Sequence, residues 1–112
     1  MAQRESRAPD PVWHVICFLA QQSAEKYLKA FLEEHNLRYT KTHDLVVLLR
    51  ASSDLLPELE TMFEALARLT AFGVAARYPG IEADSSAARD AMATAESVRS
   101  VLRTRLGLSS SR

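Results

Sequence analysis

Residues 12–34 read VWHVICFLAQQSAEKYLKAFLEE, and this stretch decides the fold because its apolar residues recur at the spacing of one helix face. Apolar side chains follow one another every three or four residues, which is the pattern of an amphipathic α-helix. This stripe consists of Trp13, Ile16, Cys17, Ala20, Ala24, Tyr27, Leu28 and Phe31. The simplest interpretation of the opposite, polar face is that water solvates it; that face carries Gln21, Gln22, Glu25, Lys26 and Lys29.

A short second helix is predicted after a linker. The first helix should end within residues 34–37, with Asn36 as its C-cap, and residues 38–41 then form the linker. Thr42 is a favourable N-cap residue for a second helix that has His43 and Asp44 in its first turn and a leucine- and valine-rich apolar side.

Two further helices are predicted beyond residue 53. Asp54 is placed to cap a third helix, with Pro57 in its first turn and apolar residues at helical spacing to about Ala76. The run RYPG at residues 77–80 should end it, because a proline disfavours the α conformation of the residue before it. One of residues 84–86 then caps a fourth helix, whose alanine-rich first half permits close helix packing.

The predicted fold is all-α: an up-down antiparallel four-helix bundle with short connections. With 112 residues the chain has room for one domain and one core. We assign the folded domain to residues 12–106, a flexible polar leader to residues 1–11, with Pro11 as the helix-entry residue, and a frayed tail to residues 107–112.

Composition limits the classes of function that the chain supports. Fourteen basic and fourteen acidic residues give a net charge of zero, so any site for nucleic acid or another anion must be local. The single cysteine, Cys17, allows no internal disulfide, and together with His14 and His35 it is spread too widely along one helix for a metal site. No phosphate-binding loop, cofactor motif, signal peptide or membrane span is recognisable, so we predict a cytoplasmic protein without cofactor or membrane partner.

Three blocks in order resemble the HEPN family, the higher eukaryote and prokaryote nucleotide-binding domains. They are CFLAQQSAEKYLKAFLEEH at residues 17–35, THDLVVLL at 42–49 and ARYPG at 76–80. The resemblance covers roughly residues 12–106. It implies a helical bundle, frequent dimerisation, and a partnership with a minimal nucleotidyltransferase in toxin–antitoxin pairs.

Two departures from the family pattern matter for function. Members usually carry another long amphipathic helix before the first block, whereas here residues 1–11 are polar, so we expect the family's first helix to be lacking and an apolar face to be exposed. Such a face predicts a homo-oligomer. HEPN ribonucleases resemble one another in an Arg and a His separated by four to six residues, and the His is absent after Arg77. Arg38 and His43 have that spacing, but they lie in the linker and at the start of the second helix.

The expected topology brings His43, Asp44, Arg77 and Tyr78 to one end of the bundle, and Lys26 is a further binding candidate. The N–H groups at a helix start, a bidentate Arg77 and the imidazole of His43 would together hold a phosphate. A purely structural interpretation is equally concrete: Asp44 pairs with Arg77, His43 caps the second helix and Tyr78 packs over the bundle end.

These features favour a HEPN-like interaction and nucleotide- or RNA-binding module without catalytic activity. The alternative is a metal-independent endoribonuclease, in which Arg38 would stabilise phosphate charge and His43 would move a proton. A third hypothesis is a helical remnant that retains only assembly.

Overall fold

The computed structural model describes residues 11–73 and 84–106, and every regular element within them is helical. In chain order these elements are α2 (Pro11–Glu34), α3 (Leu45–Ser52), the 3₁₀ helix η1 (Pro57–Met62), α4 (Phe63–Thr70), the 3₁₀ turn η2 (Ala71–Gly73) and α5 (Ser85–Arg105). The prediction of an all-helical four-helix bundle is confirmed. The expected absence of the family's first helix concerns residues 1–10, which lie outside the described part of the chain.

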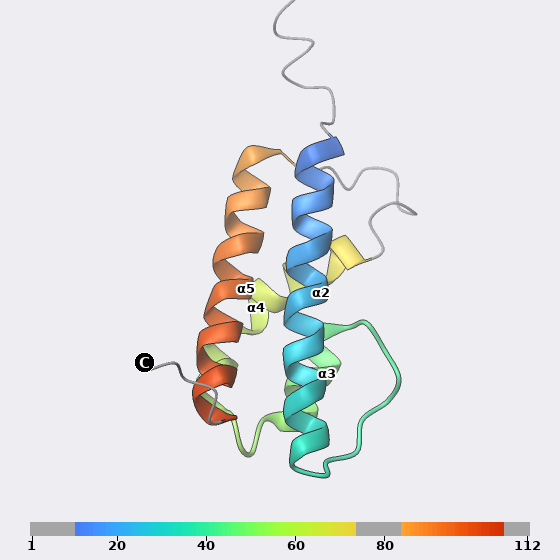
Figure 1. The fold of residues 1–112 in the computed structure, drawn as a ribbon, viewed down its shortest axis with the longest axis vertical. Coiled ribbons are helices and arrows are strands. Elements are labelled where there is room, and N and C mark those ends of the chain that lie inside the picture. Colours follow the sequence, from blue (N-terminus) through green and yellow to red (C-terminus); the bar gives the residue numbers. More distant parts are fainter. Residues whose placement is uncertain (1–10, 74–83, 107–112) are drawn as a thin grey trace, which may run out of the picture.

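The two long helices, α2 and α5, lie side by side and run in the same direction (Figure 1). The shorter α3 and α4 pack on one side of this pair and against each other. Since α3 has only eight residues, the return of the chain along α2 is made by the linker after α2 and by α4, rather than by α3 itself.

The linker begins at a well-formed helix end. Asn36 has a positive φ of 56°, the left-handed conformation that commonly follows a helix, and the Leu37 N–H donates to the Leu32 carbonyl at 2.8 Å. Asn36 therefore ends α2, as the sequence predicts. The chain then folds back, so that α3 starts beside the middle of α2 and not beyond its end (Figure 1).

The predicted helix starts are partly corrected. Asp44, not Thr42, is the N-cap of α3: its carboxylate accepts from the Val46 N–H at 2.9 Å, while the Thr42 hydroxyl accepts from the Asp44 N–H at 3.0 Å. Asp54 caps no helix, because the chain after it enters η1 at Pro57, and α4 ends at Thr70, before the expected Ala76. Proline fixes φ and lacks an N–H, which suits the first turn of a helix without a side-chain cap.

The start of α5 follows the prediction. Asp84 is extended and its carboxylate accepts from the Ala87 N–H at 2.8 Å. At the other end of α5, the Arg105 guanidinium donates to the Leu55 carbonyl and pairs with Glu58, both at 2.8 Å, which ties the helix to the start of η1.

The core lies between α2, α5 and the shorter helices. It is built from leucines and from small residues that let α2 and α5 approach closely, as the alanine-rich sequence of α5 predicts. Its members include Cys17, Ala24, Leu28, Phe31, Leu45, Leu48, Leu59, Leu66, Ala88, Ala91, Val98 and Leu102. None of the described helices is long and apolar enough to cross a bilayer.

Candidate functional site

A buried polar stripe on α2 is the most unusual feature of the described residues. Gln21, Glu25 and Lys29 follow one another at intervals of four, so they share one face of the helix. Gln21 is fully buried and Glu25 is only 6% exposed, because the linker and the start of α3 cover this face. The expectation that water solvates the polar face is therefore wrong for these two residues.

The Gln21 amide joins α2 to the linker. Its Nε2 donates to the His43 carbonyl at 2.8 Å and to Glu25 Oε1 at 3.2 Å, while its own Oε1 accepts from Gln22 at 2.8 Å. A buried amide left without hydrogen-bond partners would destabilise the fold. Here both the Nε2 group and the Oε1 atom of Gln21 are hydrogen-bonded. These bonds fix the position at which α3 begins.

The Glu25 carboxylate is the centre of the cluster. It accepts from Lys29 Nζ at 2.9 Å, and His43 Nδ1 lies 3.0 Å from both of its oxygens. Burial raises the pKa of this carboxyl group, but the hydrogen bonds from Lys29, His43 and Gln21 outweigh it and leave the pKa below its ordinary value. Glu25 is therefore ionised at neutral pH.

The pairing with Glu25 determines how the His43 ring is presented. An ionised carboxylate only accepts hydrogen bonds, so Nδ1 carries a proton and Nε2 is the ring nitrogen that remains for a ligand. The His43 side chain is 65% exposed even though its partner carboxylate is buried. The buried carboxylate thus orients the ring, and the ring is accessible from solvent. Nε2 can accept a proton when the ring is neutral and can donate a hydrogen bond to an anion when the ring is protonated.

The N-terminus of α3 has little capacity left for an anion. Leu45 N–H donates to the Thr70 hydroxyl at 2.9 Å, Val46 N–H to the Asp44 carboxylate, and Asp44 N–H to Thr42. These groups are satisfied, and the Asp44 carboxylate adds a negative charge where a phosphate was expected. Three of the N–H groups expected to hold an anion are therefore engaged within the protein, and Asp44, not His43, caps the helix.

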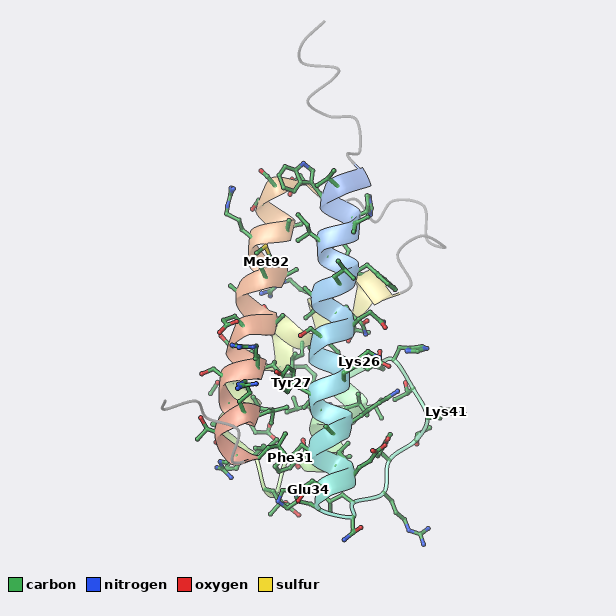
Figure 2. All side chains as sticks on the ribbon, viewed as in Figure 1. Lys26, Tyr27, Phe31, Glu34, Lys41 and Met92 are labelled. Atoms are coloured by element: carbon green, nitrogen blue, oxygen red, sulfur yellow. The ribbon has the colours of Figure 1, made fainter. Side chains whose placement is uncertain are left out.

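The other predicted site residues are only partly brought together. Arg77 and Tyr78 lie outside the described residues. Arg38 is exposed in the linker, and no hydrogen bond or ion pair joins it to His43. Lys26 is exposed on α2, and Figure 2 places it on that helix and Lys41 on the linker. The sequence did not single out Gln21 and Glu25; their spacing of four residues was visible, but their burial depends on where the linker returns.

The remaining candidate ligands do not converge. His35 Nδ1 is bound to the Phe31 carbonyl at 3.1 Å at the end of α2, and Cys17 is fully buried. Burial, followed by the nearby charges of Asp84 and Asp90, raises the pKa of the Cys17 thiol, which disfavours the reactive thiolate. Among residues 11–73 and 84–106, no group of three or more His, Cys, Asp or Glu side chains is placed to hold a metal ion.

Comparison with protein families gives one result. The family model described as "HEPN domain" matches residues 4–105, which is nearly the whole chain. Comparison with curated proteins and with solved structures gives no match.

Proposed function

The chain belongs to the HEPN domain family, and from this premise we propose that it is a self-associating module that binds nucleotide or RNA and has a minimal nucleotidyltransferase as its partner. The observation that carries the binding function is the exposed His43 ring, held at Nδ1 by the buried Glu25 carboxylate.

The His43 ring is suited to phosphate because its orientation is set before a ligand arrives. A preorganised donor loses less conformational freedom on binding than a mobile one. Lys26 and Lys41 are exposed and add positive charge on α2 and the linker. In this proposal Arg77 and Tyr78 complete the site, with the guanidinium binding phosphate in bidentate fashion and the phenol contacting a sugar or base.

We favour binding over catalysis because cleavage of RNA without a metal needs a second group against the phosphate. Arg38 lies at the family's spacing from His43, but its side chain is exposed and no hydrogen bond or ion pair within the described residues holds its guanidinium in place. Binding needs only the accessible ring and local positive charge.

One observation supports the alternative function, an endoribonuclease. A buried carboxylate bound to Nδ1 of an exposed imidazole is an arrangement that suits general acid–base catalysis. In such a reaction His43 Nε2 would take the proton of a ribose 2′-hydroxyl. The 2′-oxygen would attack phosphorus to form a 2′,3′-cyclic phosphate as the bond to the 5′-oxygen of the next nucleotide breaks. That 5′-oxygen would take a proton from water, while Arg38 stabilises the charge on the phosphate.

Fluorescence anisotropy with a mixed-sequence single-stranded RNA in EDTA separates these possibilities. We expect His43→Ala and Arg77→Ala each to weaken binding by about tenfold, since a hydrogen bond to a charged group contributes about 1.5 kcal/mol or more. Arg89→Ala, which removes an exposed cation on α5, is the matched control and should bind normally. Melting temperatures should be unchanged for Arg77→Ala.

The outcomes discriminate clearly. Equal affinity of all variants would refute the site, and equal loss of stability and binding in Arg77→Ala would favour a structural role for that residue. RNA cleavage that disappears only in His43→Ala would establish the ribonuclease alternative.

The partnership with a nucleotidyltransferase rests on family membership alone. The reading frame adjacent to the gene provides its test: a neighbouring minimal nucleotidyltransferase that co-purifies with this chain after co-expression would support the pair. We further expect the protein in the cytoplasm.

A further inference from the structure

The two ring nitrogens of His43 lie in different surroundings. Nδ1 lies 3.0 Å from both oxygens of the buried Glu25 carboxylate, whereas the His43 side chain as a whole is 65% exposed. Because the ionised carboxylate only accepts hydrogen bonds, it holds a ring proton at Nδ1. In a neutral ring the other nitrogen, Nε2, therefore carries a lone pair and no proton. Neutral His43 can accept a hydrogen bond at Nε2 but cannot donate one there.

The oxygens of a phosphodiester are also acceptors, so a neutral His43 has no hydrogen to offer them. A second proton at Nε2 changes this, because the imidazolium donates through both nitrogens and its positive charge strengthens the contact. The backbone donors that follow His43 in the chain do not replace this proton. The N–H groups of Asp44, Leu45 and Val46 are already engaged within the protein. The form of His43 that binds phosphate is therefore the imidazolium.

We propose that His43 takes up a proton from solvent when it binds phosphate, and that Glu25 and Lys29 set the pH range of this binding in opposite directions. The inference rests on the proposed function, because it concerns how the same ring holds its ligand. The proton moves from solvent to Nε2, and no covalent bond of the ligand changes. Proton binding and phosphate binding then strengthen each other. Where the free ring is neutral, the affinity should fall by up to about tenfold for each unit by which the pH rises.

Glu25 and Lys29 act on the ring with opposite sign. The negative charge of Glu25 beside Nδ1 stabilises the imidazolium. Lys29 Nζ binds Oε2 of the same carboxylate at 2.9 Å, so it offsets part of the negative charge that the ring experiences. Gln21 also donates to this carboxylate, at 3.2 Å, but it carries no charge. Loss of the Glu25 charge should therefore disfavour the imidazolium, and loss of the Lys29 charge should favour it.

The other charged groups around the ring do not pair with it. Among the described residues, Glu25 is the charged side chain that forms an ion pair with His43. The Asp44 carboxylate is engaged as the N-cap of α3, and η2 contains no titratable side chain. The remaining charged side chains of α3, α4 and the adjoining parts of α2 and the linker are Lys26, Arg38, Lys41, Arg50, Glu64 and Arg68. Glu25 and, through it, Lys29 are therefore the groups that tune the ring.

Isothermal titration calorimetry with a 2′-O-methyl uridine hexanucleotide measures the coupling. This probe has no free 2′-hydroxyl to attack its own phosphate, and its phosphodiesters keep their charge between about pH 5 and pH 8, the range in which histidine changes its own. Titrations in two buffers with different heats of ionisation give the number of protons taken up on binding. We expect wild type to take up as much as one proton near neutral pH and fewer toward the acid end, where the free ring is already charged. His43→Gln keeps an amide donor that does not titrate, and it should bind without this uptake.

Two variants with opposite effects test the roles of Glu25 and Lys29. Glu25→Gln should lose affinity at a lower pH than wild type, and Lys29→Gln should keep its affinity to a higher pH. At pH 7 the affinities of these two variants should differ by about tenfold or more, since a hydrogen bond to a charged group is gained in one and lost in the other. Glu64→Gln and Arg89→Gln remove the same charges at exposed positions on α4 and α5, and they should follow the wild-type profile. Circular dichroism checks that each variant is folded.

The outcomes separate this inference from the function on which it rests. Wild-type protein that does not bind the hexanucleotide at any pH overturns the proposed function. Binding without proton uptake, or with the same uptake in His43→Gln, leaves that function standing and overturns the coupling. A purely structural role of Glu25 and Lys29 would weaken binding in both variants at every pH, and that result would overturn their opposite effects on the ring. If Glu25→Gln does not fold, the profile of Lys29→Gln against wild type decides this last point.

Discussion

Replacement of Glu25 with Gln should destabilise the fold, because the carboxylate is buried and accepts hydrogen bonds from Lys29, His43 and Gln21. A hydrogen bond to a charged group contributes about 1.5–3 kcal/mol when buried, whereas exposed ion pairs contribute about 0–1 kcal/mol. Lys29 is partly exposed, His43 is largely exposed, and Gln retains one acceptor oxygen. We therefore expect the free energy of unfolding to fall by about 1–2 kcal/mol at pH 7, or roughly 5–10 °C in Tm for a domain of this size.

The sign of the pH dependence follows from the lowered pKa of Glu25. A carboxyl group whose pKa is lower in the folded state stabilises the protein above its unfolded pKa, near 4.5, and loses that contribution as the pH falls through the folded value. Glutamine does not titrate. The stability difference between wild type and Glu25→Gln should therefore be present at pH 7 and shrink as the pH falls below 4.5.

Urea denaturation followed by circular dichroism at a series of pH values measures this difference. Glu64→Gln removes an exposed carboxylate on α4 and should unfold like wild type at pH 7. A Glu25→Gln variant as stable as wild type at pH 7 would refute the account of the buried cluster. So would a stability difference that stays constant down to the lowest pH at which both proteins fold.

Three further predictions concern the caps, the thiol and the core. Asp84→Ala should cost about 1 kcal/mol of stability because it removes the N-cap of α5, whereas Asp54→Ala should cost close to nothing, since Asp54 caps no helix; thermal melts compare them. Cys17 should react with a thiol reagent only when the protein unfolds, so its labelling rate should rise with urea in step with the circular dichroism signal, and fast labelling of native protein would contradict its burial. Leu28→Ala should destabilise by about 2–5 kcal/mol as a fully buried core truncation, and a loss below 1 kcal/mol would show that the site collapses around it.

The helices of this fold could be predicted because they depend on local regularities. The spacing of apolar residues marks α2 and α5 directly, and Asp84 caps α5 through a bond to a residue three positions away. The start of α3 could not be predicted in the same way. The Gln21 side chain binds the His43 carbonyl across 22 positions of sequence, and α3 begins directly after this contact, with Asp44 and not Thr42 as its cap.

In the candidate site, too, the local feature could be predicted from the sequence and the tertiary contact could not. His43 was recognised from its place before a leucine-rich helix, but the carboxylate that orients it was assigned to a solvated face. A polar stripe becomes a buried cluster only when another segment covers it, and spacing along α2 carries no information about the path of the linker. The first half of α2 is different. Residues 12–20 read VWHVICFLA and are apolar on nearly all sides, a pattern typical of a helix that packs against other segments on more than one face.

The two surfaces of α2 are separate, and this separation shapes the proposed function. Leu19 and Glu25 are six residues apart, which places them about 120° apart around the helix axis. The exposed Leu19, which lines a pocket shared with α5, and the cluster under His43 therefore occupy different faces of one helix. Self-association through the Leu19 face would leave the His43 side of α2 uncovered, so single variants on either face can test the two proposed properties separately.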